Sequence, residues 1–356
     1  MPDKVVRRSS TLVAYWENEA LTVENYFAGR RVTVHPSLAQ VLASFSSPQT
    51  IGDIEASLSD IPNVETLIAD LLDYQLLLEV GSEADLFERE LQAWNWGRDA
   101  EFFHFSTKSV EYTFDFDHIR EHFEAKARES PPPSPFKIAE GDSVALYPAK
   151  PLSKGVGEVL KDRRTCRDFD RREISLQQLS DLLHWTWGKQ RHLDSSVLDQ
   201  RILKTSPSGG ARHPIEVYVF VQRVAGIPAG LYHYSVRNHE LIDLKNPISE
   251  SHLVELFSGQ YWVADASAAF IMTAMLPRVM WKYDHSRAYR VIQLDAGHLG
   301  QTFHLVATAL GLGPFTTAAL QDEKIETALG IDGVEEIVVY AGAAGVPSIA
   351  SLGETI

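Results

Sequence analysis

The sequence predicts an α+β protein in which a mixed β-sheet flanked by helices forms the C-terminal part, behind a separate N-terminal domain. Three observations support this fold class. Apolar, β-branched segments such as IEVYVFV (215–221) alternate with segments of helical spacing. A long, strongly apolar helix is expected over residues 288–310, and four prolines in the six residues 130–135 interrupt regular structure.

The proline run SPPPSP marks the expected domain boundary. Proline has no backbone N–H and a fixed φ angle, so neither a helix nor a central strand can continue through this segment. The total of 356 residues is enough for two domains. We therefore predict an N-terminal domain over residues 1–130, a proline-rich linker over 131–150 and a second domain over 151–356.

The N-terminal segment predicts a small winged-helix-like domain. LTVENY and RRVTVH alternate in polarity, which indicates two strands around a turn at Ala28 and Gly29. Three groups of apolar residues at helical spacing follow, before the apolar segment QLLLEV: Leu38, Val41, Leu42 and Phe45; Ile54 and Leu58; Leu67, Ile68, Leu71 and Leu72. Asp53, Glu55 and Asp60 lie among these helices, and no stripe of Arg or Lys is present. A peptide bound along a strand edge is therefore preferred over DNA.

The aromatic segment WNWGRDAEFFHF (94–105) has two interpretations. It could be a recognition surface, but Trp and Phe at this density are more often buried packing. Packing is the preferred interpretation.

In the C-terminal part, the expected elements alternate. Ser175 can cap a helix whose apolar face is Leu176, Leu179, Leu182 and Leu183. Strands are expected over 215–221, 268–275 and 336–342. The helix over 288–310 ends at the glycines of LGLG, and its apolar positions spread around most of its circumference. This pattern indicates a buried central helix or a subunit interface.

Composition and charge exclude several classes of function. The formal charge is −15 and the isoelectric point about 5.3, so the chain lacks the basic surface that sequence-independent nucleic-acid binding needs. A single cysteine, Cys166, excludes an internal disulfide and a cysteine-based zinc site. No run of about 18 apolar residues is present, and MPDKVVRRSS is not a signal peptide. We expect a soluble cytoplasmic protein that binds neither nucleic acid nor a membrane.

The segment DRRTCRDFDRRE (162–173) concentrates five arginines in an acidic protein. Arginine is a permanently charged, planar donor that suits a phosphate or a ring carbonyl. In an extended segment Arg163, Thr165 and Arg167 project to the same side, and Phe169 turns inward as an anchor. The alternative is a solvated charge run, in which the four acidic residues of the segment neutralise the arginines.

Two glycine-containing loops are further candidates for a binding site. SPSGGARHP (206–214) places two adjacent glycines and two serine hydroxyls before a strand, so a flat ligand can approach the backbone. A plain strand-entry loop explains these residues equally well. GLGPFTTAALQD (311–322) offers backbone amides and two threonine hydroxyls. Neither loop has the pattern of a Rossmann or P-loop site. His285, His298 and His304 lack the spacing of metal ligands, so no metal is expected.

Taken in this order, the segments resemble the FMN-binding nitroreductase superfamily. Its R-R-S-x-R-x-F motif stands here at residues 163–169, with Thr165 in place of the usual serine, which keeps the hydroxyl. The narrower resemblance is to SagB-type thiazoline/oxazoline dehydrogenases. It rests on SPSGGARHPIEVYVFV, on GLYHYSVRNHEL (230–241) and above all on WKYDHSRAYRVIQLDAGHLGQ (281–301), and it covers roughly residues 155–345.

The resemblance implies an FMN-dependent oxidoreductase with the nitroreductase-like fold. SagB-type enzymes oxidise a thiazoline or oxazoline ring, already formed from a Cys, Ser or Thr side chain, to the thiazole or oxazole of a modified peptide. Their catalytic signature is an adjacent Lys-Tyr pair, which by position is Lys282 and Tyr283 here. A base must remove a ring proton as hydride leaves, and desolvation against Trp281 can lower a lysine pKa toward neutrality. Outside this motif, the pair would indicate a surface lysine beside a packed tyrosine.

The family also implies a flavin site and a homodimer with two FMN. Its pocket lies between two subunits, so the helix over 288–310 is the expected interface. Cys166, between the motif residues, is expected to be packing. The family often adds a Lys or Arg phosphate contact beyond its last strand, whereas AGVPSIASLGETI has neither residue. The residues that match flavin-binding positions are Arg163, Arg164, Thr165, Arg167, Ser206, Pro207, Ser208, Gly209, Thr316, Thr317, Ala318 and Ala319.

The expected substrate is a modified precursor peptide, which the N-terminal domain would bind unless it binds a cyclodehydratase partner. Two alternatives remain open at this point. One is an NAD(P)H-dependent nitro or quinone reductase of the same fold. The other is a flavin-free peptide-binding regulatory protein.

Overall fold

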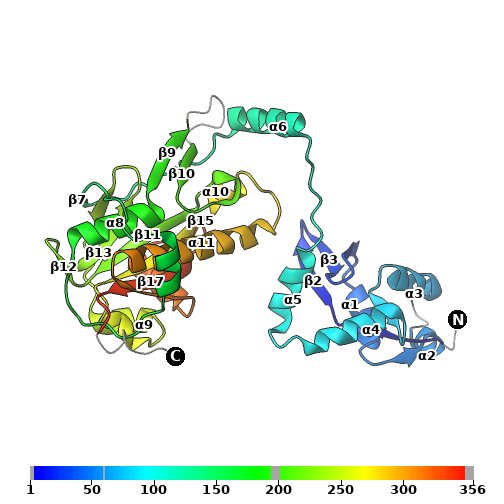
Figure 1. Cartoon of the computed structure of the whole chain (residues 1–356). Coiled ribbons are helices and arrows are strands. Elements are labelled where there is room, and N and C mark those ends of the chain that lie inside the picture. The colour runs from blue at the N-terminus through cyan, green and yellow to red at the C-terminus, as the bar shows by residue number, and fades with distance from the viewer. Residues whose placement is uncertain (1–3, 59–60, 194–200, 349–356) are drawn as a thin grey trace. The chain divides into compact units, whose positions relative to one another are not determined.

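The computed structural model describes residues 4–58, 61–193 and 201–348 (Figure 1). The chain divides into two compact units, Met1–Tyr112 and Thr113–Ile356. Each unit has its own hydrophobic core. In the described part of the chain, no helix is long and apolar enough to cross a membrane.

The N-terminal unit contains two small antiparallel sheets. Its strands are β1 (Val5–Arg8), β2 (Leu12–Glu17), β3 (Ala20–Asn25), β4 (Arg30–Val34), β5 (Gln49–Thr50) and β6 (Leu77–Glu79). One sheet has the order β5-β1-β6 and the other the order β2-β3-β4. The predicted hairpin is confirmed, because β3 pairs with β4 and Gly29 in the connecting turn has a φ of +65°.

Short helices pack on these sheets. They are α1 (Leu38–Ser44), α2 (Ile51–Ser57), α3 (Val64–Asp73), α4 (Glu83–Glu90), the 3₁₀ turn η1 (Leu91–Ala93) and α5 (Gly97–Ser106). The first three are the predicted helices, and their apolar faces meet Val6 and Leu77 around the buried Phe45 and Ile68. These elements follow in the order α1-β5-α2-α3-β6, with β1 completing the sheet, and the winged-helix-like fold of this unit stays a prediction.

The aromatic segment 94–105 is packed on one side only. Phe102 contacts Tyr26 and Phe105 contacts Phe27 edge to face, with ring centroids 5.5 and 4.9 Å apart. In contrast, Trp96 is 80% exposed, and α5 has no fully buried residue. Packing therefore accounts for Phe102 and Phe105 and leaves Trp96 at the surface.

The C-terminal unit is built on a seven-stranded sheet. In spatial order its strands are β16 (Gly313–Thr317), β17 (Glu336–Gly345), β15 (Ala268–Met275), β11 (Ile215–Val221), β13 (Gly230–Ser235), β14 (Glu240–Asp243) and β7 (Asp142–Ala145). The three strands predicted in this part of the chain are confirmed. Every residue of β11 is buried, as its apolar sequence requires.

The direction of the strands differs from the expectation of a mixed sheet. Every pairing in this sheet is antiparallel. Among the described strands, the parallel pair is β8 (Ile174–Ser175) with β12 (Val224–Ala225), and β9 (Lys189–Leu193) forms a separate antiparallel pair with β10 (Arg201–Lys204). An apolar strand indicates burial on both faces, which this sheet has, but burial does not determine strand direction.

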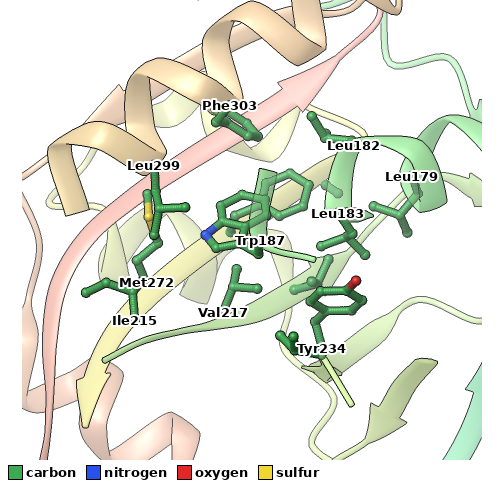
Figure 2. Close-up of a cluster of buried hydrophobic side chains, with 14 of the residues drawn as sticks. Leu179, Leu182, Leu183, Trp187, Ile215, Val217, Tyr234, Met272, Leu299 and Phe303 are labelled. Carbon is green, nitrogen blue, oxygen red and sulfur yellow. The ribbon is translucent and has the colours of Figure 1, made fainter. Parts of the chain in front are cut away.

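The C-terminal unit also contains several helices. They are α6 (Phe116–Glu129), α7 (Val156–Asp162), α8 (Leu176–Trp187), α9 (Glu250–Leu256), α10 (Leu276–Met280), α11 (Ala288–Ala309) and α12 (Asp322–Leu329), with the 3₁₀ turns η2 (Gly209–Ala211) and η3 (Tyr261–Ala264). One core contains residues of α8 and α11, and the other contains residues of α9 and α12. Figure 2 shows Trp187 at the centre of the first core, with Phe303 on its helix side and Val217 on its sheet side.

Both predicted helices of this core are confirmed. Ser175 caps α8 through a capping box with Gln178. α11 spans 22 residues, and eleven of them, including Asp295, are buried. One stripe of α11 remains at the surface, where Leu294 is 61% exposed.

The proline-rich segment and the helix before it lie on the C-terminal unit. The indole N–H of Trp281 donates to the carbonyl of Ser130, and Nε of Arg278 donates to the carbonyl of Ser134, at 2.7 and 2.8 Å. Phe136 is buried in the core shared by α8 and α11. The chain leaves the N-terminal unit at Tyr112, so α6 and the prolines belong to the second unit.

Candidate functional site

Lys282 and Tyr283 lie on a turn that continues α10. Both backbone N–H groups donate to the carbonyl of Val279, at 3.0 and 2.9 Å. Arg278, in α10, is buried. It donates to the carbonyl of His213 at 3.0 Å and to the carbonyl of Ser134. These bonds fix the backbone from which the Lys-Tyr pair extends.

The Lys-Tyr pair meets the glycine loop that follows β10. A Cβ atom built on Gly210 would lie 2.5 Å from Nζ of Lys282 and 2.7 Å from the hydroxyl of Tyr283. Gly210 also has a φ of +59°, which L-residues with side chains rarely adopt. Two segments that the sequence singled out separately are thus in direct contact, and the second glycine of SPSGG permits it.

The glycine loop is anchored on α11. The hydroxyls of Ser206 and Thr302 lie 2.6 Å apart, and Ser208 donates to Oδ2 of Asp295 at 2.5 Å. The N–H of Gly209 donates to the other carboxylate oxygen of Asp295 at 3.1 Å. Burial raises the pKa of Asp295, against the opposite effect of these two hydrogen bonds. The Asp295 carboxylate therefore fixes the loop, because it accepts from both Ser208 and Gly209.

The arginine motif follows α7 as an extended segment. Cys166 and Phe169 are buried, whereas Thr165 and Arg167 are exposed and Arg163 is half-buried. Phe169 is the predicted anchor, and it forms an isolated β-bridge with the segment after β17. The exposure pattern agrees with Thr165 and Arg167 projecting away from the core.

The three motif arginines have different surroundings. The guanidinium of Arg167 lies over the rings of Trp262 and Phe315, at 5.7 and 5.5 Å from the centroids. Arg164 donates to backbone carbonyls of its own segment at 2.8 and 3.0 Å. Within the described ranges, Arg163, Arg164 and Arg167 form no ion pair, while Arg172 pairs with an acidic neighbour. The solvated charge run therefore describes Arg172 better than the motif arginines.

A buried histidine joins the arginine motif to the third candidate segment. Arg163 donates to Nδ1 of His304 at 3.5 Å, so Nε2 carries the proton and donates to Oγ1 of Thr316 at 3.1 Å. The hydroxyl of Tyr340 donates to the same oxygen at 2.9 Å. Burial and the neighbouring Arg163 lower the pKa of His304 to about 4, so the ring is neutral. With two bonds accepted, the Thr316 hydroxyl keeps its own proton for another acceptor.

The other residues of the third segment lie at the end of β16. Oγ1 of Thr317 accepts from the N–H of Ala319 at 3.0 Å, and the carbonyl of Ala319 accepts from Gln260 at 2.9 Å. Ala318 and Ala319 are exposed. Gly313, before them, is required by packing, because a Cβ there would lie 2.6 Å from Sγ of Cys166.

The candidate flavin-binding residues divide into two groups on opposite sides of α11. The glycine loop bonds to Asp295 and Thr302, which are seven residues apart and share one side of the helix. The arginine motif bonds to His304, which lies about 200° around the helix from Thr302, since each residue turns by about 100°. Within one chain the two groups therefore contact opposite sides of α11.

A buried charge cluster beneath the glycine loop was missed by the sequence analysis. Glu216 accepts from Arg278 at 2.6 Å and from Nε2 of His233 at 3.0 Å. Burial alone would raise the pKa of Glu216, but Arg278 and His233 hold it at about 2. Burial lowers the pKa of Lys204 to about 8 and that of His213 to about 3. A lysine and a glutamate on strands of two different sheets give no local signal of such a cluster.

Comparison with known proteins identifies the fold. The profile of the Nitroreductase family matches residues 160–346, which is more than half of the chain. The chain belongs to the nitroreductase family. This is a family of oxidoreductases whose members typically bind a flavin. The matched range contains the arginine motif, the glycine loop and the Lys-Tyr pair, whereas α6 lies outside it.

Three relatives are similar to this chain over different shares of its length. The trifolitoxin-processing protein TfxB of Rhizobium leguminosarum bv. trifolii is 36% identical over 166 residues, which are 45% of this chain and 44% of TfxB. The trifolitoxin operon protein TfxC of the same organism is 23% identical over 316 residues, 84% of this chain and 88% of TfxC. MJ1384 of Methanocaldococcus jannaschii, a candidate nitroreductase, is 32% identical over 174 residues, 49% of this chain and 83% of MJ1384. The chain spans less than half the length of TfxB.

The residues of this nitroreductase domain fit FMN by their chemistry. Arg163, Arg164 and Thr165 offer guanidinium and hydroxyl donors that suit a phosphate. The backbone of the glycine loop and the hydroxyl of Thr316 suit the edge of a flat ring. Beyond the last strand, where the sequence has no Lys or Arg for a phosphate contact, residues 346–348 are described and 349–356 lie outside the described residues. Nowhere in the described ranges are three His, Cys, Asp or Glu side chains grouped to hold a metal ion.

Proposed function

We propose that this protein is an FMN-dependent dehydrogenase that oxidises thiazoline or oxazoline rings of a modified peptide to thiazole or oxazole. The observation that carries the proposal is the contact of Lys282 and Tyr283 with Gly210 of the candidate flavin loop. The likeness to TfxB, a trifolitoxin-processing protein, and to TfxC, a trifolitoxin operon protein, supports a peptide as the substrate.

The proposed reaction removes two hydrogens from the ring, one as a proton and one as a hydride. FMN, when bound, supplies the acceptor for the hydride. Lys282 takes the ring proton on Nζ, which lies over the rings of Tyr283 and Phe123 at 5.6 and 6.0 Å. Tyr283 and Gly210 limit the positions that this amine can adopt. Lys282 thus contacts the rings of Tyr283 and Phe123. The ring of Trp281, which was expected to desolvate Lys282, contacts Lys126 and Arg212.

The proposed FMN site is shared between two protomers. Arg163, Arg164, Thr165 and Arg167 would hold the phosphate and ring edge, with Thr316 to Ala319, while Ser206 to Gly209 come from the second protomer. The positions of these two groups on opposite sides of α11 support this arrangement. The exposed stripe of α11, with Leu294 at 61% exposure, is the proposed dimer interface. Gly297 has no atom within 4 Å of a built Cβ, so a second helix can approach closely.

The N-terminal unit is proposed to bind the precursor peptide, either alone or together with a cyclodehydratase. The sheet β2-β3-β4 has two edge strands, and an added peptide strand is a common mode of recognition at such edges. The match to TfxC extends over 84% of this chain, so it includes part of the N-terminal unit. We place the protein in the cytoplasm, where peptide and cyclodehydratase would meet it.

The decisive experiment combines a cofactor and a substrate assay on the full chain. Purified protein, loaded with FMN, should absorb near about 450 nm and should oxidise a synthetic peptide that contains a single thiazoline. Lys282→Ala should lose ring oxidation and retain FMN absorbance. Lys204→Met is the control for the choice of base, because Lys204 is a second lysine and its pKa is lowered to about 8. If Lys204→Met abolished oxidation and Lys282→Ala did not, the base would be misassigned.

The likeness to MJ1384 favours one other function, an NAD(P)H-dependent nitro or quinone reductase. Such an enzyme would oxidise NAD(P)H rapidly in steady state with a quinone acceptor. Slow NAD(P)H oxidation together with ring oxidation would exclude it. Protein that stays colourless after FMN addition would exclude both enzymes and favour a flavin-free peptide-binding role.

A further inference from the structure

Helix α6 lies outside the matched family range and yet contacts the turn that carries the proposed base. The ring of Phe123 lies 5.6 Å from the ring of Trp281, and the carbonyl of Ser130 accepts from the Trp281 indole at 2.7 Å. The ammonium of Lys126 lies over the same indole at 5.6 Å. Three residues from one turn of α6 and its C-cap therefore fix the helix beside Lys282.

Phe123 is placed where it can contact a substrate. The Nζ atom of Lys282 is 6.0 Å from the centroid of the Phe123 ring. Phe123 is only half-buried, so packing against Trp281 does not cover the whole ring. Phe114 and Phe116, by comparison, are more than three quarters exposed and have no such neighbour in the site.

Lys282 and Phe123 are close enough to contact neighbouring residues of one bound peptide, since Nζ lies 6.0 Å from the ring centroid. Consecutive Cα atoms are about 3.8 Å apart, so a ring that presents its C–H to Lys282 places its flanking residue within reach of Phe123. The surroundings are apolar and cationic, because Lys126 and Arg212 both lie over Trp281. An apolar or aromatic side chain fits beside Phe123, and a cationic one is repelled.

We propose that Phe123 determines substrate specificity by receiving an apolar or aromatic side chain next to the ring that is oxidised. The inference rests on the proposed function, and it adds a residue class that the peptide should carry. It also assigns part of the active site to α6, a helix that the nitroreductase profile does not include.

The test compares two peptides that differ in one position. Both contain a single thiazoline, flanked by Phe in one peptide and by Gly in the other. The wild-type protein should favour the Phe peptide in kcat/KM by about tenfold, the low end of what an added apolar contact can give. Phe123→Ala should lose most of this preference through a raised KM for the Phe peptide, and Phe123→Leu should be intermediate. Phe116→Ala, on the same helix and 76% exposed, is the matched control.

Binding affinity for the same peptides, measured by fluorescence anisotropy, separates the two proposals. Wild-type protein that oxidises neither peptide, but binds the Phe peptide more tightly with a preference that Phe123→Ala loses, would overturn the proposed function and keep the role of Phe123. Wild-type protein that oxidises both peptides with a preference unchanged in Phe123→Ala would overturn the role of Phe123 alone. An equal loss of kcat for both peptides would also overturn it, because Phe123 would then only support the Lys282 turn.

Discussion

Gly210 and Lys282 approach so closely that a Cβ atom on the glycine would lie 2.5 Å from the lysine amine. The contact joins a loop and a turn that are remote in sequence. The glycine also has the positive φ that other residues adopt only under strain. Both properties make Gly210 a sensitive position for testing the proposed site.

We expect Gly210→Ala to displace Lys282 and Tyr283 and to lower ring oxidation at least tenfold. The strained backbone should also lower the free energy of unfolding by about 1–3 kcal/mol. Single-turnover assays by mass spectrometry measure the first effect and thermal unfolding the second. Gly157→Ala, on α7, is the control, because nothing lies within 4 Å of a Cβ there. A wild-type oxidation rate in Gly210→Ala would contradict the assigned role of the Lys-Tyr pair.

His304 is expected to control FMN affinity without touching the substrate. It connects Arg163 to Thr316 through its two ring nitrogens and stays neutral because burial and Arg163 lower its pKa to about 4. His304→Leu removes both bonds and should weaken FMN binding about tenfold, which corresponds to about 1.4 kcal/mol. His304→Gln can accept from Arg163 and donate to Thr316, so it should restore most of the affinity.

The readout for His304 is the dissociation constant of FMN from flavin fluorescence titration. His252→Leu, at a partly exposed position of α9 remote from the arginine motif in sequence, controls for loss of a histidine. If His304→Leu bound FMN as tightly as the wild type, the chain from Arg163 to Thr316 would have no part in the flavin site.

Local pattern was sufficient to predict much of the fold. The strand over 215–221 and the helix capped by Ser175 depend on the polarity and capping of adjacent residues, which the sequence displays directly. The direction of the strands depends on connections between remote segments, and the expected mixed sheet is antiparallel for that reason. The apolar residues of β11 indicate that the strand is buried, but they do not indicate which strands pair with it.

The site was predicted only in part, for the same physical reason. The arginine motif, the glycine loop and Lys282 were selected through a resemblance to a known family. Their spacing in the sequence does not show that the motif and the loop contact opposite sides of α11. The roles of Phe123 and His304 depend on contacts across more than a hundred residues. A half-buried Phe on a charged helix resembles ordinary packing until Lys282 is seen beside it.

The pair Glu216 and Arg278 is expected to dominate acid stability. Arg278 holds the folded pKa of Glu216 at about 2, below its ordinary 4.5, so its stabilising contribution is complete above about pH 4.5 and is lost as pH falls toward 2. His213, whose pKa burial lowers to about 3, acts in the same direction below about pH 6.5. Glu216→Gln leaves Arg278 buried without its anion and should cost about 3–5 kcal/mol at neutral pH.

Thermal unfolding from about pH 7 down to about pH 3 tests this assignment. Below about pH 4.5, Glu216→Gln should lose less stability than the wild type, because the titrating group is gone. The exposed ion pair Lys245–Asp142 provides the control, since Asp142→Asn should change stability by less than about 1 kcal/mol. An unchanged acid profile in Glu216→Gln would assign the acid sensitivity to other groups.

The last prediction concerns the exposed stripe of α11. Leu294 is 61% exposed beside Gly297, and the two candidate flavin groups lie on opposite sides of the same helix. Leu294→Glu buries a charge if two copies of α11 pack together, so it should give monomers and, because each site takes residues from both protomers, should lower bound FMN in parallel. Val334→Glu, at an apolar position that is 72% exposed, should leave both unchanged. Light scattering and the ratio of flavin to protein absorbance measure the two effects together. A monomer that keeps its full FMN would show that one protomer completes the site, and a dimer that persists would place the interface elsewhere.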